Sequence, residues 1–163
     1  TDVGKAAVLF YLLAYGATNV RAFGVMAALS TRMREFDDIR EFTGLWHRRR
    51  GMAGLMTVFL LSLGGFPPTA GFIAKWYVFG AAMQTGHYWL AIVGVLSSVV
   101  AVFYYLRIVI AMYMTDEKPE GALPRVPGLA LAGLTLALGG VLYLGILPAW
   151  AIDAARESIG TIF

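Results

Sequence analysis

Four apolar stretches constrain the fold of this chain more than any other feature of its sequence. They run roughly over residues 6–29, 51–83, 88–113 and 128–147. A helix needs about 20 predominantly apolar residues to cross the hydrocarbon core of a bilayer, and each stretch reaches that length. With 59% hydrophobic and only 14% charged residues, the chain is also too apolar for an ordinary soluble domain. The sequence therefore predicts an all-α, polytopic membrane protein with about four spans.

Residue types argue against several classes of function. Cysteine is absent and the only histidines are His47 and His87, so there is no thiolate cluster, haem-attachment motif or zinc-ligand spacing. We expect no cofactor or metal in this chain and any redox centre in another one. The net charge of +3 comes from arginines beside apolar spans, where orientation signals are expected, so we predict no nucleic-acid partner. The chain begins without methionine, and we expect residues 1–163 to be a single transmembrane segment of a larger subunit.

Lys and Arg are distributed unequally between the connections. Eight of them lie in the connections at about 30–50 and 114–127, whereas only Lys5 and Arg156 lie on the opposite side. By the positive-inside rule, both basic connections face the cytoplasm and both termini face the periplasm. We expect this topology in a bacterial inner (plasma) membrane.

The first basic connection carries apolar residues near helical spacing, namely Phe36, Ile39, Phe42 and Leu45. Their interleaving with charges predicts a short amphipathic helix at the membrane interface. A solvated loop that only determines topology is the alternative.

The second apolar stretch is overlong for one straight crossing, and the sequence Gly-Gly-Phe-Pro-Pro interrupts it at residues 64–68. Pro67 and Pro68 have no N–H to donate to the carbonyls of Leu63 and Gly64, so we expect two half-helices with free carbonyls between them. Non-helical backbone at this depth is tolerated only against protein or a water-filled cavity. The interruption therefore predicts a hydrated, polar point inside the membrane.

Lys75 lies about two turns beyond this break and far from either end of its span, where its amine cannot easily reach the headgroups. Desolvation disfavours the ammonium form, so a lysine at this depth can take up and release a proton. Pro68, Gly71, Lys75 and Phe79 share one helical face, on which glycine is expected to leave room for the amine. No Asp or Glu lies inside any span, so we expect the charge partner of Lys75 to be water or a residue outside this chain. The alternative is a simple packing kink.

Polar residues in the first span share one face, which must meet protein or water; they are Tyr11, Tyr15, Thr18, Asn19 and Arg21. For the first four, hydrogen bonding between packed helices is the favoured interpretation. Arg21 is expected to lie against protein or to border a water cavity. In the fourth span a face of small residues predicts the close approach of another helix; it consists of Gly133, Ala137 and Gly140.

The segment GGFPPTAGFIAKWYVF resembles the broken helix of the antiporter-like proton-translocating subunits of respiratory complex I, especially subunit N (subunit 2) of NADH-quinone oxidoreductase. The flanking segments YLLAYGATNVRAFGV, DDIREFTGLWHRRR and FYYLRIVIAMY are similar to the preceding helix, the loop and the following helix of that subunit. The resemblance covers nearly the whole chain. It implies the C-terminal segment, the last four helices, of a 14-helix antiporter-like fold.

The resemblance implies proton translocation, coupled to quinone reduction elsewhere in the complex. Lys75 matches the lysine of the broken helix, a proton-relay residue that this family places toward the outer half-channel. We also expect supporting roles for residues around the lysine, which are Pro67, Pro68, Thr69, Gly71, Tyr77, Tyr104, Tyr105 and Arg21. Arg21 departs from the pattern, because glycine is expected there. NADH, FMN, iron-sulfur clusters and quinone are expected in other subunits of the complex, and the expected partners are those membrane-arm subunits, the lipid bilayer, protons and water.

Two other interpretations stay open. In the first, the chain belongs to a cation/proton antiporter or to the proton-pumping subunit of a membrane-bound hydrogenase, because only PTAGF with the following lysine and tyrosine, and YYLR, favour subunit N. Other members of the superfamily carry glutamate at the position of Lys75. In the second interpretation, the chain is a structural membrane scaffold in which Lys75 is inert.

Overall fold

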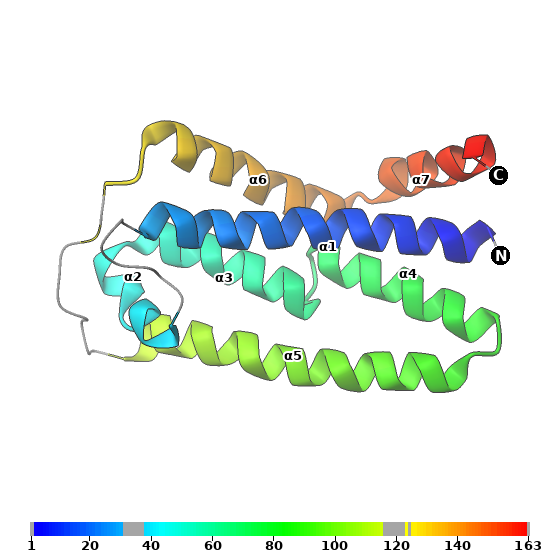
Figure 1. The fold of residues 1–163 in the computed structure, drawn as a ribbon, viewed down its shortest axis with the longest axis horizontal. Helices are drawn as coiled ribbons and strands as arrows, with labels where there is room; N and C mark the ends of the chain where they lie inside the picture. Colours follow the sequence, from blue (N-terminus) through cyan, green and yellow to red (C-terminus); the bar gives the residue numbers. More distant parts are fainter. Residues whose placement is uncertain (1, 31–37, 116–122, 124, 163) are drawn as a thin grey trace.

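The computed structural model of this chain describes residues 2–30, 38–115, 123 and 125–162 (Figure 1). Within these residues every regular element is a helix, which confirms the predicted all-α fold. The elements in chain order are α1 (Asp2–Leu29), the short 3-10 helix η1 (Ile39–Phe42), α2 (Leu45–Arg48), α3 (Arg50–Gly64), α4 (Ala70–Gln84), α5 (Tyr88–Met114), α6 (Gly128–Ile146) and α7 (Ala149–Ile162).

Within the described residues, three helices are long and apolar enough to cross a membrane, over Gly4–Leu29, Tyr88–Met114 and Gly128–Ile146. Helices α3 and α4 have 15 residues each, so each is about 22 Å long and shorter than the hydrocarbon core of about 30 Å. They follow one another along α1, and together they run alongside it (Figure 1). The predicted broken helix is therefore present.

Helix α1 lies at the centre of the bundle, where it packs against α3, α4, α6 and α7, while α5 packs against α3 and α4. Large side chains from four elements are fully buried between them: Val25, Leu29, Leu45, Phe59 and Met112. The outer face of α5 carries many exposed apolar side chains, as expected for a helix that meets lipid or another membrane chain.

The segment at 38–50 is structured, but it is not the single amphipathic helix that the sequence predicted. Gly44 has a φ of 64°, a left-handed conformation that separates η1 from α2. Phe42 and Leu45 are buried, and the Gly44 N–H donates to the carbonyl of Ala111 at 3.0 Å. The apolar side chains therefore face protein, and Phe36 lies outside the described residues.

The two ends of the chain lie together at one end of the bundle, and η1 and α2 lie at the other (Figure 1). Helix α7, which the sequence reasoning missed, runs beside the N-terminal part of α1. Its Ala151 and Ile152 are buried, whereas Asp153 and Glu157 are exposed. Because only one of its faces is apolar, α7 does not resemble a membrane span in sequence.

Candidate functional site

The break between α3 and α4 leaves two backbone carbonyls without a backbone donor. Gly65, with a φ of 86°, caps α3, and its N–H donates to Leu61 at 2.9 Å and Ser62 at 3.1 Å. The next two carbonyls, those of Leu63 and Gly64, would be bonded by residues 67 and 68 in a continuous helix, but both are prolines. The sequence therefore predicted correctly which carbonyls are free.

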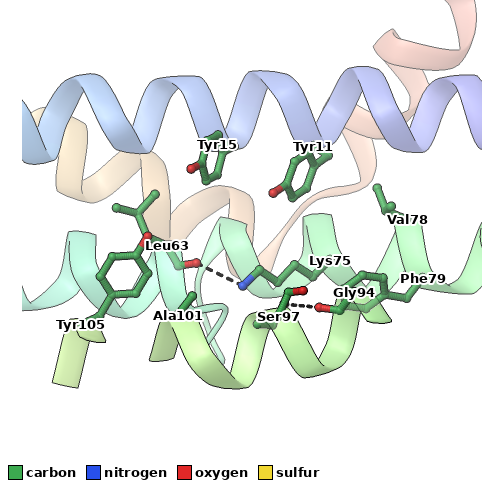
Figure 2. Close-up of a pocket in the computed structure, with 11 residues that line it drawn as sticks. Tyr11, Tyr15, Leu63, Lys75, Val78, Phe79, Gly94, Ser97, Ala101 and Tyr105 are labelled. Atoms are coloured by element: carbon green, nitrogen blue, oxygen red, sulfur yellow. Dashed lines mark hydrogen bonds between the residues drawn. The ribbon is translucent and has the colours of Figure 1, made fainter. Parts of the chain in front are cut away.

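The amine of Lys75 bonds to both of these carbonyls. Nζ donates to the oxygen of Leu63 at 3.1 Å (Figure 2). It also donates to the oxygen of Gly64 at 2.8 Å, and the side chain is half-buried. Both acceptors are neutral backbone carbonyls at the C-terminal end of α3, so the expectation of a charge partner outside this chain stays a prediction. The lysine thus connects the two half-helices directly.

Two glycines, Gly71 and Gly65, allow this arrangement. The sequence predicted that Gly71 leaves room for the amine, but its role differs. A Cβ on Gly71 would overlap the backbone of Ser62, so this glycine lets α4 approach α3 and does not make room for the amine. The Gly71 N–H also donates to the Ser62 hydroxyl at 3.3 Å. The room for the lysine comes from Gly65, where a Cβ would lie 2.9 Å from Cδ of Lys75 and 3.3 Å from its Nζ.

The connection between the half-helices is closed on one side by α6. A Cβ on Gly145 of α6 would collide with the carbonyl of Pro68. Thr69 is buried and its hydroxyl donates to the Phe66 carbonyl at 2.5 Å, whereas Pro67 and Pro68 are exposed. The loop is thus held by protein on the α6 side, as non-helical backbone inside a membrane requires.

On the other side, Lys75 borders a pocket of about 400 Å³ between α1, α4 and α5 (Figure 2). Its lining includes five hydroxyl groups and no Asp or Glu; the lining residues are Tyr11, Tyr15, Leu63, Lys75, Val78, Phe79, Gly94, Ser97, Ser98, Ala101 and Tyr105. Within the part of the chain that the structure describes, no cluster of His, Asp or Glu is suited to a metal ion. The pocket therefore combines one amine with neutral hydroxyls, a set that can bind water and exchange protons.

Of the predicted supporting tyrosines, only Tyr105 reaches the pocket. Tyr104 is 57% exposed and packs edge-on against Phe103, with the ring centroids 5.7 Å apart. Tyr77 contacts the ring of Phe10 at 6.5 Å and is not part of the lining. The geometry thus separates two adjacent tyrosines that sequence reasoning could not distinguish.

Arg21 lies on the side of α1 that meets α6, and it does not line the pocket. A Cβ on Gly140 would be 3.8 Å from Nη2 of Arg21, and one on Gly24 would be 3.4 Å from Cδ2 of Leu134. The predicted small-residue face is only partly used, since a Cβ on Gly133 would meet nothing within 4 Å.

The polar face of α1 does not form the expected hydrogen bonds between helices at Thr18 and Asn19. Their side chains donate to carbonyls of their own helix, Thr18 to Ala14 at 2.7 Å and Asn19 to Tyr15 at 3.1 Å. Tyr11 and Tyr15 line the pocket instead. Their spacing of four residues put them on one face, but only the packing of α1 across the break brings that face to Lys75.

These observations define a class of protein: a polytopic helical membrane protein with a broken helix whose lysine borders a hydroxyl-lined pocket. The chain belongs to the family described as NADH:quinone oxidoreductase/Mrp antiporter, transmembrane, whose model matches residues 1–101. This membership confirms the resemblance seen in the sequence around the break.

Curated relatives and solved structures agree with this membership. The chain is 47% identical over 156 residues to NADH-quinone oxidoreductase subunit N 2 of Roseiflexus castenholzii, which covers 96% of this chain and 31% of that protein. It is 39% identical over 164 residues to subunit N 1 of Solibacter usitatus, covering 99% and 34%. A chain of respiratory complex I from Thermus thermophilus superposes with a TM-score of 0.77 at 30% identity, over 93% of this chain and 34% of that one.

A chain of the Mrp complex from Dietzia sp. shares the fold, with a TM-score of 0.81 at 22% identity over 98% of this chain and 38% of that chain. This chain spans about a third of the length of the curated relatives that it matches.

Proposed function

We propose that this chain is part of a proton-translocating membrane subunit of NADH:quinone oxidoreductase, and that Lys75 carries protons within it. The observation that carries the proposal is the position of the Lys75 amine, bound to the free carbonyls of the break and bordering the hydroxyl-lined pocket. Family membership and the relatives named subunit N support the same reading. Quinone reduction would take place elsewhere in the complex.

The geometry of the amine allows proton exchange without loss of its anchoring. A charged ammonium has three N–H donors, and the carbonyls of Leu63 and Gly64 accept two of them. When the third proton leaves toward the pocket, the neutral amine keeps two donors for the same carbonyls and presents a lone pair in its place. Lys75 can therefore change charge while the two half-helices stay connected.

Two opposing effects act on the Lys75 amine, so both the ammonium and the neutral amine are accessible. The end of α3 presents carbonyl oxygens, the negative end of the helix dipole, which stabilise the ammonium. Partial burial away from bulk water removes hydration and stabilises the neutral amine. A relay residue needs both forms, because a group held permanently in one form cannot pass a proton on.

The same proposal determines where the cofactors, the partners and the two faces of the membrane lie. NADH, FMN, iron-sulfur clusters and quinone would be bound by other subunits, and the partners of this chain would be the neighbouring subunits of the membrane arm. The arginine-rich end with η1 and α2 would face the cytoplasm and the two chain ends the periplasm of a bacterial inner membrane.

A cation/proton antiporter is the second candidate, supported by the shared fold of the Mrp complex chain. The relatives at 38–47% identity that carry the name subunit N favour the first candidate. Purification of the intact protein from its membrane discriminates the two, because only the first predicts co-purification with flavin- and iron-sulfur-containing chains.

The relay role is tested by Lys75→Ala and Lys75→Arg in the intact subunit, with proton pumping and quinone reduction measured on assembled complexes. Alanine removes the carrier and arginine keeps a proton it cannot release, so both should slow pumping, by about 10²-fold or more for a positioned acid–base group. Arg107→Ala removes an exposed cation of α5 outside the pocket and should pump normally. Near-normal pumping by Lys75→Arg would falsify the relay role.

A further inference from the structure

Three tyrosine hydroxyls share the pocket with Lys75. Tyr11 and Tyr15 enter it from α1 and Tyr105 enters it from α5 (Figure 2). Among the residues that the structure describes, none of these hydroxyls is hydrogen-bonded to protein. Tyr11 and Tyr105 are partly buried and Tyr15 is exposed, so all three hydroxyls are available to water in the pocket.

The serines of the pocket differ from the tyrosines in this respect. The Ser97 hydroxyl donates to the carbonyl of Val93 at 2.8 Å, and that of Ser98 donates to the carbonyl of Gly94 at 2.9 Å. Their protons are engaged within α5, so they can only accept hydrogen bonds from the pocket. The tyrosines can both accept and donate, which a group that hands protons on must do.

The tyrosines also have a defined direction relative to Lys75. Tyr11 and Tyr15 are stacked one turn apart, with ring centroids 5.5 Å apart and an interplanar angle of 12°. Tyr15 and Tyr105 lie on the side of Lys75 that leads toward η1 and α2, whereas Val78 and Phe79 lie on the side of the chain ends (Figures 1 and 2).

The side toward the chain ends is apolar and tightly packed. A Cβ on Gly94 would lie only 2.6 Å from Cε1 of Phe79, so the Phe79 ring fills the space between α4 and α5 there. The Phe79 ring thus narrows the pocket on the side of the chain ends.

We propose that Tyr11, Tyr15 and Tyr105, with intervening water, conduct protons between Lys75 and the bundle interior on the side of the arginine-rich end. This inference rests on the relay role of Lys75. Each hydroxyl accepts a proton on its oxygen lone pair as its own proton passes to the next oxygen, so one O–H bond forms for each that breaks. Lys75 changes between ammonium and amine, and the tyrosines end neutral. The pocket volume of about 400 Å³ leaves room for water, which takes about 30 Å³ per molecule in the liquid.

The test replaces the tyrosines by phenylalanine, singly and together, in the intact subunit within its assembled complex. Phenylalanine keeps the ring and removes only the hydroxyl. Each single variant should slow pumping by roughly fivefold, the effect of losing one hydrogen bond from the transfer path, and the triple variant by more. The matched control is Tyr104→Phe, because that neighbouring tyrosine is exposed and lies outside the pocket. The single variants keep the test decisive should the triple variant not assemble.

The solvent deuterium isotope effect on pumping separates proton conduction from packing. It should rise in the pocket variants, since proton transfer then limits the rate more strongly, and should stay unchanged in Tyr104→Phe. Pumping equal to that of Tyr104→Phe would overturn the inference, and so would slower pumping with an unchanged isotope effect. Impaired Lys75 variants alongside unaffected tyrosine variants would refute only the tyrosine path, whereas normal pumping by Lys75→Arg would refute the relay itself.

Discussion

Gly71→Ala should separate the two half-helices of the broken helix. The Cβ of alanine would overlap the backbone of Ser62, at a point where the Gly71 N–H already contacts the Ser62 hydroxyl. Backbone atoms cannot avoid the methyl group by changing rotamer, so α4 must move away from α3. That movement lengthens the hydrogen bonds from Lys75 to the carbonyls of Leu63 and Gly64.

The size of the effect follows from a comparison within α4. Overpacking costs about 1–3 kcal/mol. A change from glycine to alanine inside a helix by itself stabilises the folded state by about 1 kcal/mol. Gly80 provides the control, because a Cβ there meets nothing within 4 Å in this chain. The stability of Gly71→Ala should therefore be lower than that of Gly80→Ala by about 1–3 kcal/mol, a factor of about 5 to 150 in the folding equilibrium.

Thermal stability of the subunit within the solubilised complex measures this difference, and proton pumping reports the displaced lysine. We expect Gly71→Ala to dissociate or denature at a lower temperature than Gly80→Ala and to pump more slowly. Equal stability and equal pumping of the two variants would refute the close approach of α3 and α4 at Gly71.

Two further predictions concern topology and Arg21. Single cysteines at Thr43 and Gln84, which lie at opposite ends of the bundle, should label from opposite faces of the membrane, with residue 43 on the cytoplasmic side; labelling of both from one side would contradict the four-span topology. Arg21→Gly should preserve assembly and most pumping, because Arg21 lies against Gly140 of α6 and outside the pocket. Normal assembly with complete loss of pumping would instead make Arg21 part of the proton path.

The chemistry of the break could be derived from the sequence because it depends on local covalent structure. Proline lacks an N–H wherever it occurs, so the free carbonyls of Leu63 and Gly64 follow from Pro67 and Pro68 alone. The length of the apolar stretches likewise determines the spans, since the thickness of the bilayer is known in advance. Local rules thus account for the membrane spans, the break and the candidate lysine.

Tertiary packing decided which side chains surround Lys75, because the residues that meet it are distant in sequence. The periodicity of α1 placed Tyr11 and Tyr15 on one face but could not show that this face crosses the break. Adjacent tyrosines on α5 point to opposite environments, and only the orientation of that helix distinguishes Tyr105 from Tyr104.

The contrast between local rules and tertiary packing also explains the other differences between the predicted and the observed structure. Helix α7 is stabilised by contacts with α1, and a helix whose formation depends on such contacts has little signal of its own. The role of Gly71 depends on the approach of α3, which no local rule specifies. The spans, the break and the lysine follow from covalent geometry and bilayer thickness, which act on each stretch of the chain alone. The partners of that lysine follow from packing across the whole bundle, because they come from helices whose relative positions no local rule specifies.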